Sequence, residues 1–228
     1  MSAPVAHVVL ALLMLPKHFP DKNPKEFIIG TSFPDIRYFG TISREKTHPK
    51  GVTLDIVKKE PSCFKAGMLF HALVDEKRLE YMQKHNIYEI IPKNRHVDTS
   101  LKFFEDILLY DKIKNWKKII SYFDTILYEE RLFGIPEEQI LKWHCFLKNY
   151  FSARITPHSS LTLYMTIKYT PIPKVMLKYF ALLLIKTKLL PIKINLILQA
   201  IEQFAKNKTL KNIVRNFYIN FEKIVDSP

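Results

Sequence analysis

The chain has 228 residues, enough for one sizeable hydrophobic core or for one domain with a helical appendage. Its 47% hydrophobic and 13% aromatic content excludes intrinsic disorder over most of the chain. The 35 basic and 22 acidic residues leave a net charge of +13, which attracts phosphate groups but could equally reflect compositional drift toward lysine. Only 5 glycines are present, which disfavours a multi-stranded sandwich and predicts an all-α fold.

The first predicted element is a helix over residues 5–15, which are apolar on nearly every face. This stretch resembles the core of a secretion signal. However, it has no basic segment before it and no small-residue cleavage site after it. We therefore expect a buried first helix and a cytoplasmic rather than a secreted protein. We expect Pro16 to end this helix and Pro34 to lie in the first turn of an element that opens at Ser32.

The clearest helical pattern covers residues 64–85. Its residues of one face recur at three- and four-residue intervals and are Phe64, Gly67, Met68, His71, Val74, Asp75 and Arg78. Asn86 is expected to cap the end of this helix. The next helix is predicted over 101–112, with its N-cap among Asp98, Thr99 and Ser100. Further helices are predicted over 116–128, 137–150, 194–204 and 210–224.

Residues 175–190 are very apolar but carry three lysines, so the segment is too short and too charged for a membrane span. The basic apolar stretch 174–193 could contact a membrane peripherally, although a core helix with solvated lysines is the simpler interpretation. We divide the chain into a metal-binding helical domain over 1–170 and a C-terminal helical extension over 171–228 packed on it.

Histidines and acids gather in the first third of the chain. His71 and Asp75 are four residues apart on one predicted helix, so both project from the same face and can reach a common metal ion. His7, Asp35 and His48 are further candidates. Each also has a purely structural interpretation. His7 could be a core imidazole, Asp35 could complement a helix dipole, and His48 could be a solvated loop residue.

Taken together, these positions form a recognisable series. The motifs are A-H-V-V-L-A from Ala6, I-G-T-S-F-P-D-I-R from Ile29, R-E-K-T-H from Arg44 and G-M-L-F-H-A-L-V-D from Gly67. In order and approximate spacing, this series resembles the bacterial zinc-dependent phospholipase C family (phospholipase C/D domain). The resemblance covers about a third of the chain.

The resemblance implies an all-α hydrolase that cleaves a phosphodiester with a metal-activated water. It implies a cluster of one to three zinc ions, although Mn²⁺ or Fe would accept the same donors. By position, His7 would bind one zinc ion and Asp35 would bridge or ligate at the centre. His48, His71 and Asp75 would complete a neighbouring site. The implied substrate is a phosphoester or a phospholipid.

The sequence departs from the family in its remaining ligands. The family uses a processed N-terminal amine, a further His and a His-x-x-x-Glu motif. The one His-x-x-x-Glu here joins His85 to Glu89, where the long helix is expected to end. His96, Glu105 and Asp106 are alternative suppliers of metal ligands or of support for them. Because Glu105 and Asp106 are adjacent on a helix, we expect at most one of them to face inward.

Cations among the candidate ligands suit a phosphate group. Arg37 and Arg44 offer bidentate forks to phosphate oxygens, and Lys46 offers a point charge. Asp35 and Arg37 are the expected catalytic residues. The alternative is that Arg37 forms an ion pair with Asp35 or Glu45.

Two other classes of protein remain open. One is a non-catalytic helical protein that keeps part of the metal site. The other is a basic module for anionic membranes or nucleic acid, although no nucleic-acid motif is present and we do not expect that partner. The sequence contains no Gly-rich phosphate loop, no GxSxG and no HExxH. Cys63 and Cys145 do not form a disulfide framework.

Overall fold

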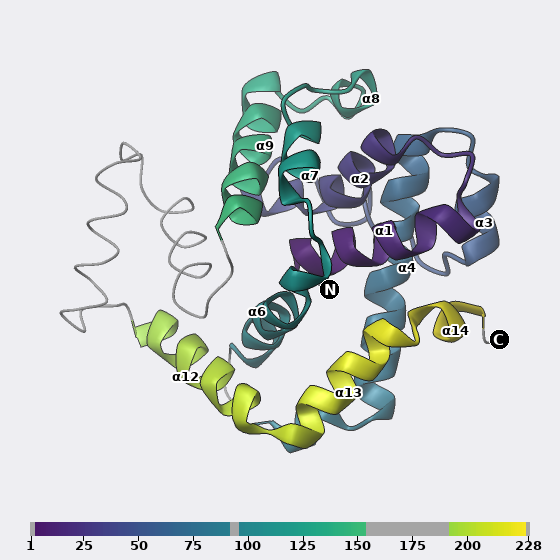
Figure 1. The fold of residues 1–228 in the computed structure, drawn as a ribbon. Helices are drawn as coiled ribbons and strands as arrows, with labels where there is room; N and C mark the ends of the chain where they lie inside the picture. Colours follow the sequence, from purple (N-terminus) through teal and green to yellow (C-terminus); the bar gives the residue numbers. More distant parts are fainter. Residues whose placement is uncertain (1–2, 92–95, 154–191, 227–228) are drawn as a thin grey trace.

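The computed structural model describes residues 3–91, 96–153 and 192–226, and all regular elements in these ranges are helices (Figure 1). The predicted all-α fold is therefore confirmed for the described residues. The elements are α1 (Pro4–His18), α2 (Pro24–Ser32), η1 (Phe33–Phe39), α3 (Leu54–Lys59), α4 (Cys63–Lys84), α5 (Ile87–Ile90), α6 (Val97–Leu109), η2 (Tyr110–Lys112), α7 (Trp116–Tyr122), α8 (Tyr128–Arg131), α9 (Glu137–Ser152), α12 (Ile192–Lys206), α13 (Lys208–Ile219) and α14 (Phe221–Asp226).

The long helix α4 closely follows the sequence prediction. The Ser62 side chain accepts a hydrogen bond from the Lys65 amide and caps its start. Beyond its end, Asn86 adopts a left-handed conformation with φ of 48°, as expected of a residue that terminates a helix. The predicted opening of an element at Ser32 is also observed, because η1 follows with Pro34 in its first turn.

Other predicted boundaries are wrong. Helix α1 continues through Pro16 to His18, and its last turn is tied to α14 by Lys17 and His18, which both contact the Glu222 carboxylate. Helix α6 begins at Val97, so the proposed N-cap residues lie inside it. The helix predicted over 116–128 ends at residue 122, and the one over 210–224 is interrupted at Asn220.

Two glycines let α2 and α4 cross with their backbones in contact. A Cβ on Gly30 would overlap the carbonyl of Phe64, and a Cβ on Gly67 would overlap the carbonyl of Phe27. A side chain at either position would force the helices apart. This close crossing brings the end of α2 against the middle of α4, where the Thr31 hydroxyl donates to the Gly67 carbonyl.

The last helices pack along the same framework. Aromatic contacts join α12 to α6 through Phe204 and Phe104, and α13 to α4 through Phe217 and Tyr81. Figure 1 shows α13 running beside α4, with α12 turning away toward α6. The predicted segment 175–190 and the division between residues 170 and 171 lie outside the described residues, as does all but the end of the stretch 174–193. Among the described helices, none is both long and apolar enough to cross a membrane.

Candidate metal centre

Five predicted ligands from separate parts of the chain meet in the interior. His7 comes from α1, Asp35 from η1, His48 from the loop before α3, and His71 and Asp75 from adjacent turns of α4. All five are buried. Ligand atoms lie within 4.8 Å of one another in two groups, which are His7 with His71 and Asp75, and Asp35 with His48 and His71. The sequence series thus corresponds to one place in the fold.

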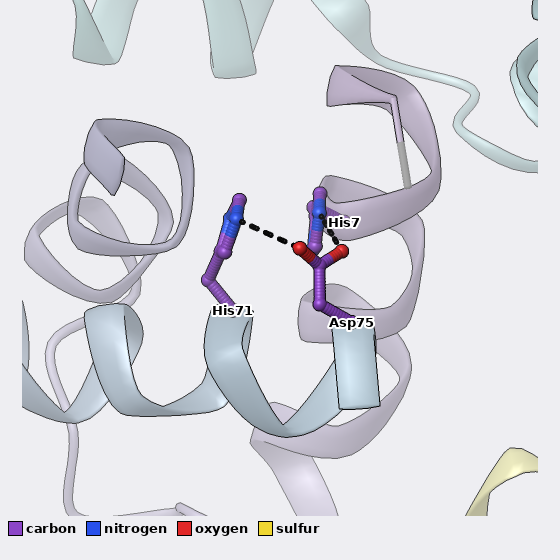
Figure 2. A group of neighbouring side chains, drawn as sticks. All are labelled: His7, His71 and Asp75. Atoms are coloured by element: carbon purple, nitrogen blue, oxygen red, sulfur yellow. Dashed lines mark ion pairs between the residues drawn. The ribbon is translucent and has the colours of Figure 1, made fainter. Parts of the chain in front are cut away.

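Asp75 lies between the histidines. Its Oδ1 is 3.4 Å from His7 Nε2, and its Oδ2 is 3.6 Å from His48 Nε2 and 3.8 Å from His71 Nε2. Figure 2 shows His7 and the two α4 side chains converging, with one carboxylate oxygen of Asp75 turned toward His71 and the other toward His7. The His7 ring stacks on the His71 ring at 3.8 Å between centroids. The carboxylate therefore presents one oxygen to each side of the cluster.

The tautomer of His71 is fixed by a backbone carbonyl. Its Nδ1 lies 2.8 Å from the Thr31 oxygen, which can only accept a hydrogen bond. Nδ1 must therefore carry the proton and donate it. In the neutral ring, the lone pair then belongs to Nε2, the nitrogen that faces the cluster. A carbonyl behind the ring is the usual support of a metal-binding histidine.

The Nδ1 of His48 pairs with a hydroxyl. The Thr47 hydroxyl oxygen lies 2.8 Å from His48 Nδ1 and 3.2 Å from the Arg44 carbonyl oxygen, and its single proton goes to one of these two acceptors. When the carbonyl accepts this proton, His48 Nδ1 donates to the hydroxyl, and the lone pair of the neutral ring is on Nε2. In that tautomer, which is the one that can bind a metal ion through Nε2, both histidines direct a lone pair toward the same point.

Those two Nε2 atoms are only 3.1 Å apart. In this metal-binding tautomer the two lone pairs repel each other unless a cation lies between them, whereas in the other tautomer His48 Nε2 donates a hydrogen bond to His71 Nε2. Two nitrogens bound to one tetrahedral zinc ion at about 2.0–2.1 Å would be separated by roughly 3.3–3.4 Å. The observed spacing fits a shared cation.

Three further buried atoms of the centre have no hydrogen-bond partner among the described residues. Both ring nitrogens of His7 and Oδ1 of Asp35 make no hydrogen bond within the described part of the chain. A buried polar atom left unsatisfied costs about 1–3 kcal/mol. Imidazole nitrogens and carboxylate oxygens are the donors that zinc accepts, so the residues present fit this metal.

Burial keeps His48 and His71 neutral. It is the main cause that holds the pKa of His71 well below its ordinary value, and the neighbouring His7 acts in the same direction. Burial also lowers the pKa of His48 to about 4, against the opposing effect of Asp75. Neutral imidazole is the form that binds metal. At neutral pH these two rings are therefore in the protonation state that a metal ion requires.

The two carboxyl groups differ. Burial opposes the ionisation of Asp75, but the neighbouring His7 and His71 rings outweigh it and hold the pKa of Asp75 well below the ordinary range. Burial, with repulsion from Asp75, raises the pKa of Asp35. Asp75 is thus a permanent anion, whereas Asp35 is the better proton acceptor.

The pKa of His48 gives a testable pH dependence of stability in metal-free protein. Because its folded pKa of about 4 lies below the ordinary value of 6.5, the unfolded state binds more protons between these values. The contribution of His48 is present above about pH 6.5 and is lost as the pH falls toward 4. Asp35, whose pKa is raised, changes the stability with pH in the opposite direction. The contribution of His48 alone is therefore obtained by comparing wild type with His48→Gln.

As the pH falls from about 6.5 to 4, we expect wild type to lose more unfolding free energy than His48→Gln does. Urea denaturation at several pH values in the presence of a chelator measures it. A difference that does not vary with pH would show that His48 is equally protonated in both states.

Cations surround one side of the centre. The Nε of Arg37 is 3.8 Å from Asp35 Oδ1, and its guanidinium lies over the Tyr38 ring and donates to the Tyr38 hydroxyl. The predicted ion pair with Asp35 is therefore observed. Arg44 is exposed, yet its charge acts on His48. Lys46 is exposed, and no contact places it at the ligands.

Lys102 of α6 is a further cation that the sequence did not reveal. Burial lowers its pKa, and the carboxylates of Asp35 and Asp75 counter this shift. Its ammonium group is therefore close enough to interact electrostatically with both carboxylates. The supporting acceptors Thr31 and Thr47 were also not predicted, because a backbone carbonyl and a single hydroxyl have no spacing pattern of their own.

The alternative ligands lie elsewhere. His85 bonds to the Tyr81 carbonyl and stacks on the Tyr81 ring. Glu89 is exposed on α5, and His96 occupies the N-cap position of α6. None of these three belongs to the ligand groups found among the described residues.

Glu105 and Asp106 are both fully buried, so the expectation that only one faces inward is wrong. Neighbouring residues on a helix point about 100° apart, but α6 is enclosed on several sides. Glu105 binds Arg78 of α4 and Tyr218 of α13. Asp106 binds the first turn of α1 and Tyr150 of α9. They support the site helices rather than join the ligand groups.

Comparison with known proteins found no family model, no curated protein and no solved structure that matches this chain. Over the described residues, the chain is an all-α protein with a buried His/Asp cluster that could hold a metal ion. Any narrower assignment depends on the sequence motifs and on the geometry of this cluster.

Proposed function

We propose that this chain is a zinc-dependent hydrolase that acts on a phosphodiester with water as nucleophile, in the manner of the phospholipase C family that its motifs resemble. The observation that carries the proposal is the pair of Nε2 atoms of His48 and His71, 3.1 Å apart, each with its Nδ1 engaged elsewhere. A cation shared by the two nitrogens fits this spacing, as does a hydrogen bond between the rings, and the unsatisfied His7 and Asp35 atoms beside them favour the cation. Mn²⁺ or Fe would satisfy the same donors.

In this proposal, His48, His71 and Asp75 hold one ion, and His7 and Asp35 extend the site on either side. A bound zinc ion would supply a Lewis acid for phosphoryl oxygens and would lower the pKa of water toward about 7. The two groups of ligand atoms also provide for more than one ion. The 3.1 Å spacing of the His48 and His71 Nε2 atoms supports their use as ligands of one ion.

The remaining groups suit a phosphodiester. Asp35, whose pKa is raised by burial and by Asp75, would accept the proton of the attacking water. Arg37, held by Asp35 and Tyr38, would bind the phosphate oxygens. Arg44 and Lys102 add positive charge on the same cluster, which favours an anionic substrate.

The test is the metal content of protein purified without affinity histidines. We expect at least one zinc ion per chain in wild type and a loss of zinc in His71→Ala, because His71 belongs to both ligand groups. His85→Ala is the matched control, since His85 lies outside them and should retain the metal. Zinc-dependent hydrolysis of bis(p-nitrophenyl) phosphate should follow the zinc content.

Three outcomes separate the hypotheses. Absence of zinc in folded wild type, even after zinc is added, would refute the metal centre. Stoichiometric zinc without turnover of any phosphodiester would favour a non-catalytic helical protein. Salt-dependent binding to anionic vesicles that survives His71→Ala would favour a basic binding module.

A further inference from the structure

We infer that Asp106 is a positioning residue that aims the His7 imidazole at Asp75 by holding the first turn of α1. This inference deepens the proposed function and rests on it for the role of His7 as a ligand. It concerns a residue that contacts no ligand atom and acts through a helix backbone.

Asp106 binds α1 where the helix begins. Its Oδ1 accepts a hydrogen bond from the Ala6 amide at 2.8 Å, and its Oδ2 accepts one from the Val5 amide at 3.1 Å. These are the first amides that α1 can offer, because Pro4 has none and Ala3 has no capping side chain. The cap of α1 therefore comes from a carboxylate 100 residues away in the sequence.

His7 follows these two residues directly, and no hydrogen bond restrains its ring. Neither of its ring nitrogens makes a hydrogen bond among the described residues, in contrast to His48 and His71, which are each fixed through Nδ1. The aim of the His7 ring is set by its backbone and by stacking on His71. A shift or rotation of the first turn of α1 would therefore displace His7 Nε2 from its place 3.4 Å from Asp75.

Asp106 is itself rigidly held. It is fully buried, and the Tyr150 hydroxyl of α9 donates to its Oδ2 at 2.8 Å. Its neighbour Glu105 holds Arg78, which lies on α4 three residues beyond Asp75. The adjacent acids of α6 thus fix the two helices that bring His7 and Asp75 together.

The experiment compares Asp106→Asn with Tyr150→Phe. The asparagine side chain keeps an oxygen for one amide, but its NH₂ group cannot accept from the other, and the negative charge at the start of α1 is lost. Tyr150→Phe removes a buried hydrogen bond from the same carboxylate and leaves both α1 bonds intact. It therefore measures the merely structural cost of disturbing Asp106.

We expect the ring-nitrogen NMR signals of His7 in metal-free protein to move in Asp106→Asn and to stay in place in Tyr150→Phe. Zinc affinity should fall about 10-fold or more in Asp106→Asn, the range found for supporting residues of metal sites. The zinc affinity of Tyr150→Phe should equal that of wild type. If Asp106→Asn does not fold, Asp106→Glu retains the charge and moves the acceptors by one methylene, and the same His7 shift is expected.

Equal His7 signals and equal zinc affinity in wild type and in the Asp106 variants would overturn the inference while leaving the metal centre intact. Equal effects of Asp106→Asn and Tyr150→Phe would also overturn it, because they would show a general structural role. If wild type binds no zinc, the proposed function is refuted independently of this inference. The His7 signals in metal-free protein then still decide whether Asp106 positions the His7 ring.

Discussion

Gly67→Ala is expected to destabilise the protein by about 3 kcal/mol, at the upper end of the usual cost of overpacking. The added Cβ would overlap the carbonyl of Phe27 and lie 2.8 Å from the amide nitrogen of Thr31. Both obstacles are backbone atoms of α2, which cannot move without moving the helix. Intrinsic helix propensity predicts the opposite sign, because alanine is favoured over glycine by about 1 kcal/mol inside a helix.

Urea denaturation of Gly67→Ala decides between these two signs. The substitution should also weaken zinc binding, since α2 supplies the Thr31 carbonyl that fixes His71. Gly134→Ala is the control. That glycine has φ of 69° and open space around it, so it should cost roughly 1–2 kcal/mol through backbone strain alone and leave zinc binding unchanged. A Gly67→Ala protein more stable than wild type would contradict the close crossing of α2 and α4.

Arg78→Met is expected to cost about 3–5 kcal/mol, because it leaves a buried carboxylate without its counter-charge. Glu105 is fully buried, and Arg78 donates to it from Nε at 2.8 Å and also from a terminal nitrogen. The hydroxyl of Tyr218 also donates to this carboxylate, at 2.6 Å, but it cannot replace a full charge. Thermal or chemical denaturation measures the loss.

The double variant Arg78→Met, Glu105→Leu tests the cause. Removing both charges removes the uncompensated carboxylate, so much of the lost stability should return. Tyr218 then lacks its acceptor, so the recovery should be incomplete. A double variant less stable than Arg78→Met would mean that the network contributes mainly through packing, not through charge compensation.

The sequence predicted α4 and its two candidate ligands because the information there is local. His71 and Asp75 are separated by one helical turn, and the pattern of 64–85 requires no knowledge of the remaining chain. The convergence of His7, Asp35 and His48 on this helix was expected only from the ordered series of motifs. No single one of these residues carries a signal that distinguishes a ligand from a core histidine, a dipole complement or a loop residue.

The predictions that were wrong depend on distant contacts. Pro16 was expected to end the first helix, but the turn beyond it is held by Glu222 from the other end of the chain. At most one of Glu105 and Asp106 was expected to face the interior. Both are interior because Arg78 and the start of α1 provide partners on different sides of α6. Helix periodicity describes one helix at a time and does not show how many neighbours surround it.

His71 belongs to both ligand groups, yet it has one nitrogen to offer. Its Nδ1 is committed to the Thr31 carbonyl, and the lone pair on Nε2 can bind only one ion at a time. Two ions in the centre therefore cannot be equivalent, because one of them must do without this histidine. Titration with metal should then show a tight step followed by a weaker one, and the first ion bound would determine which position is left for the second.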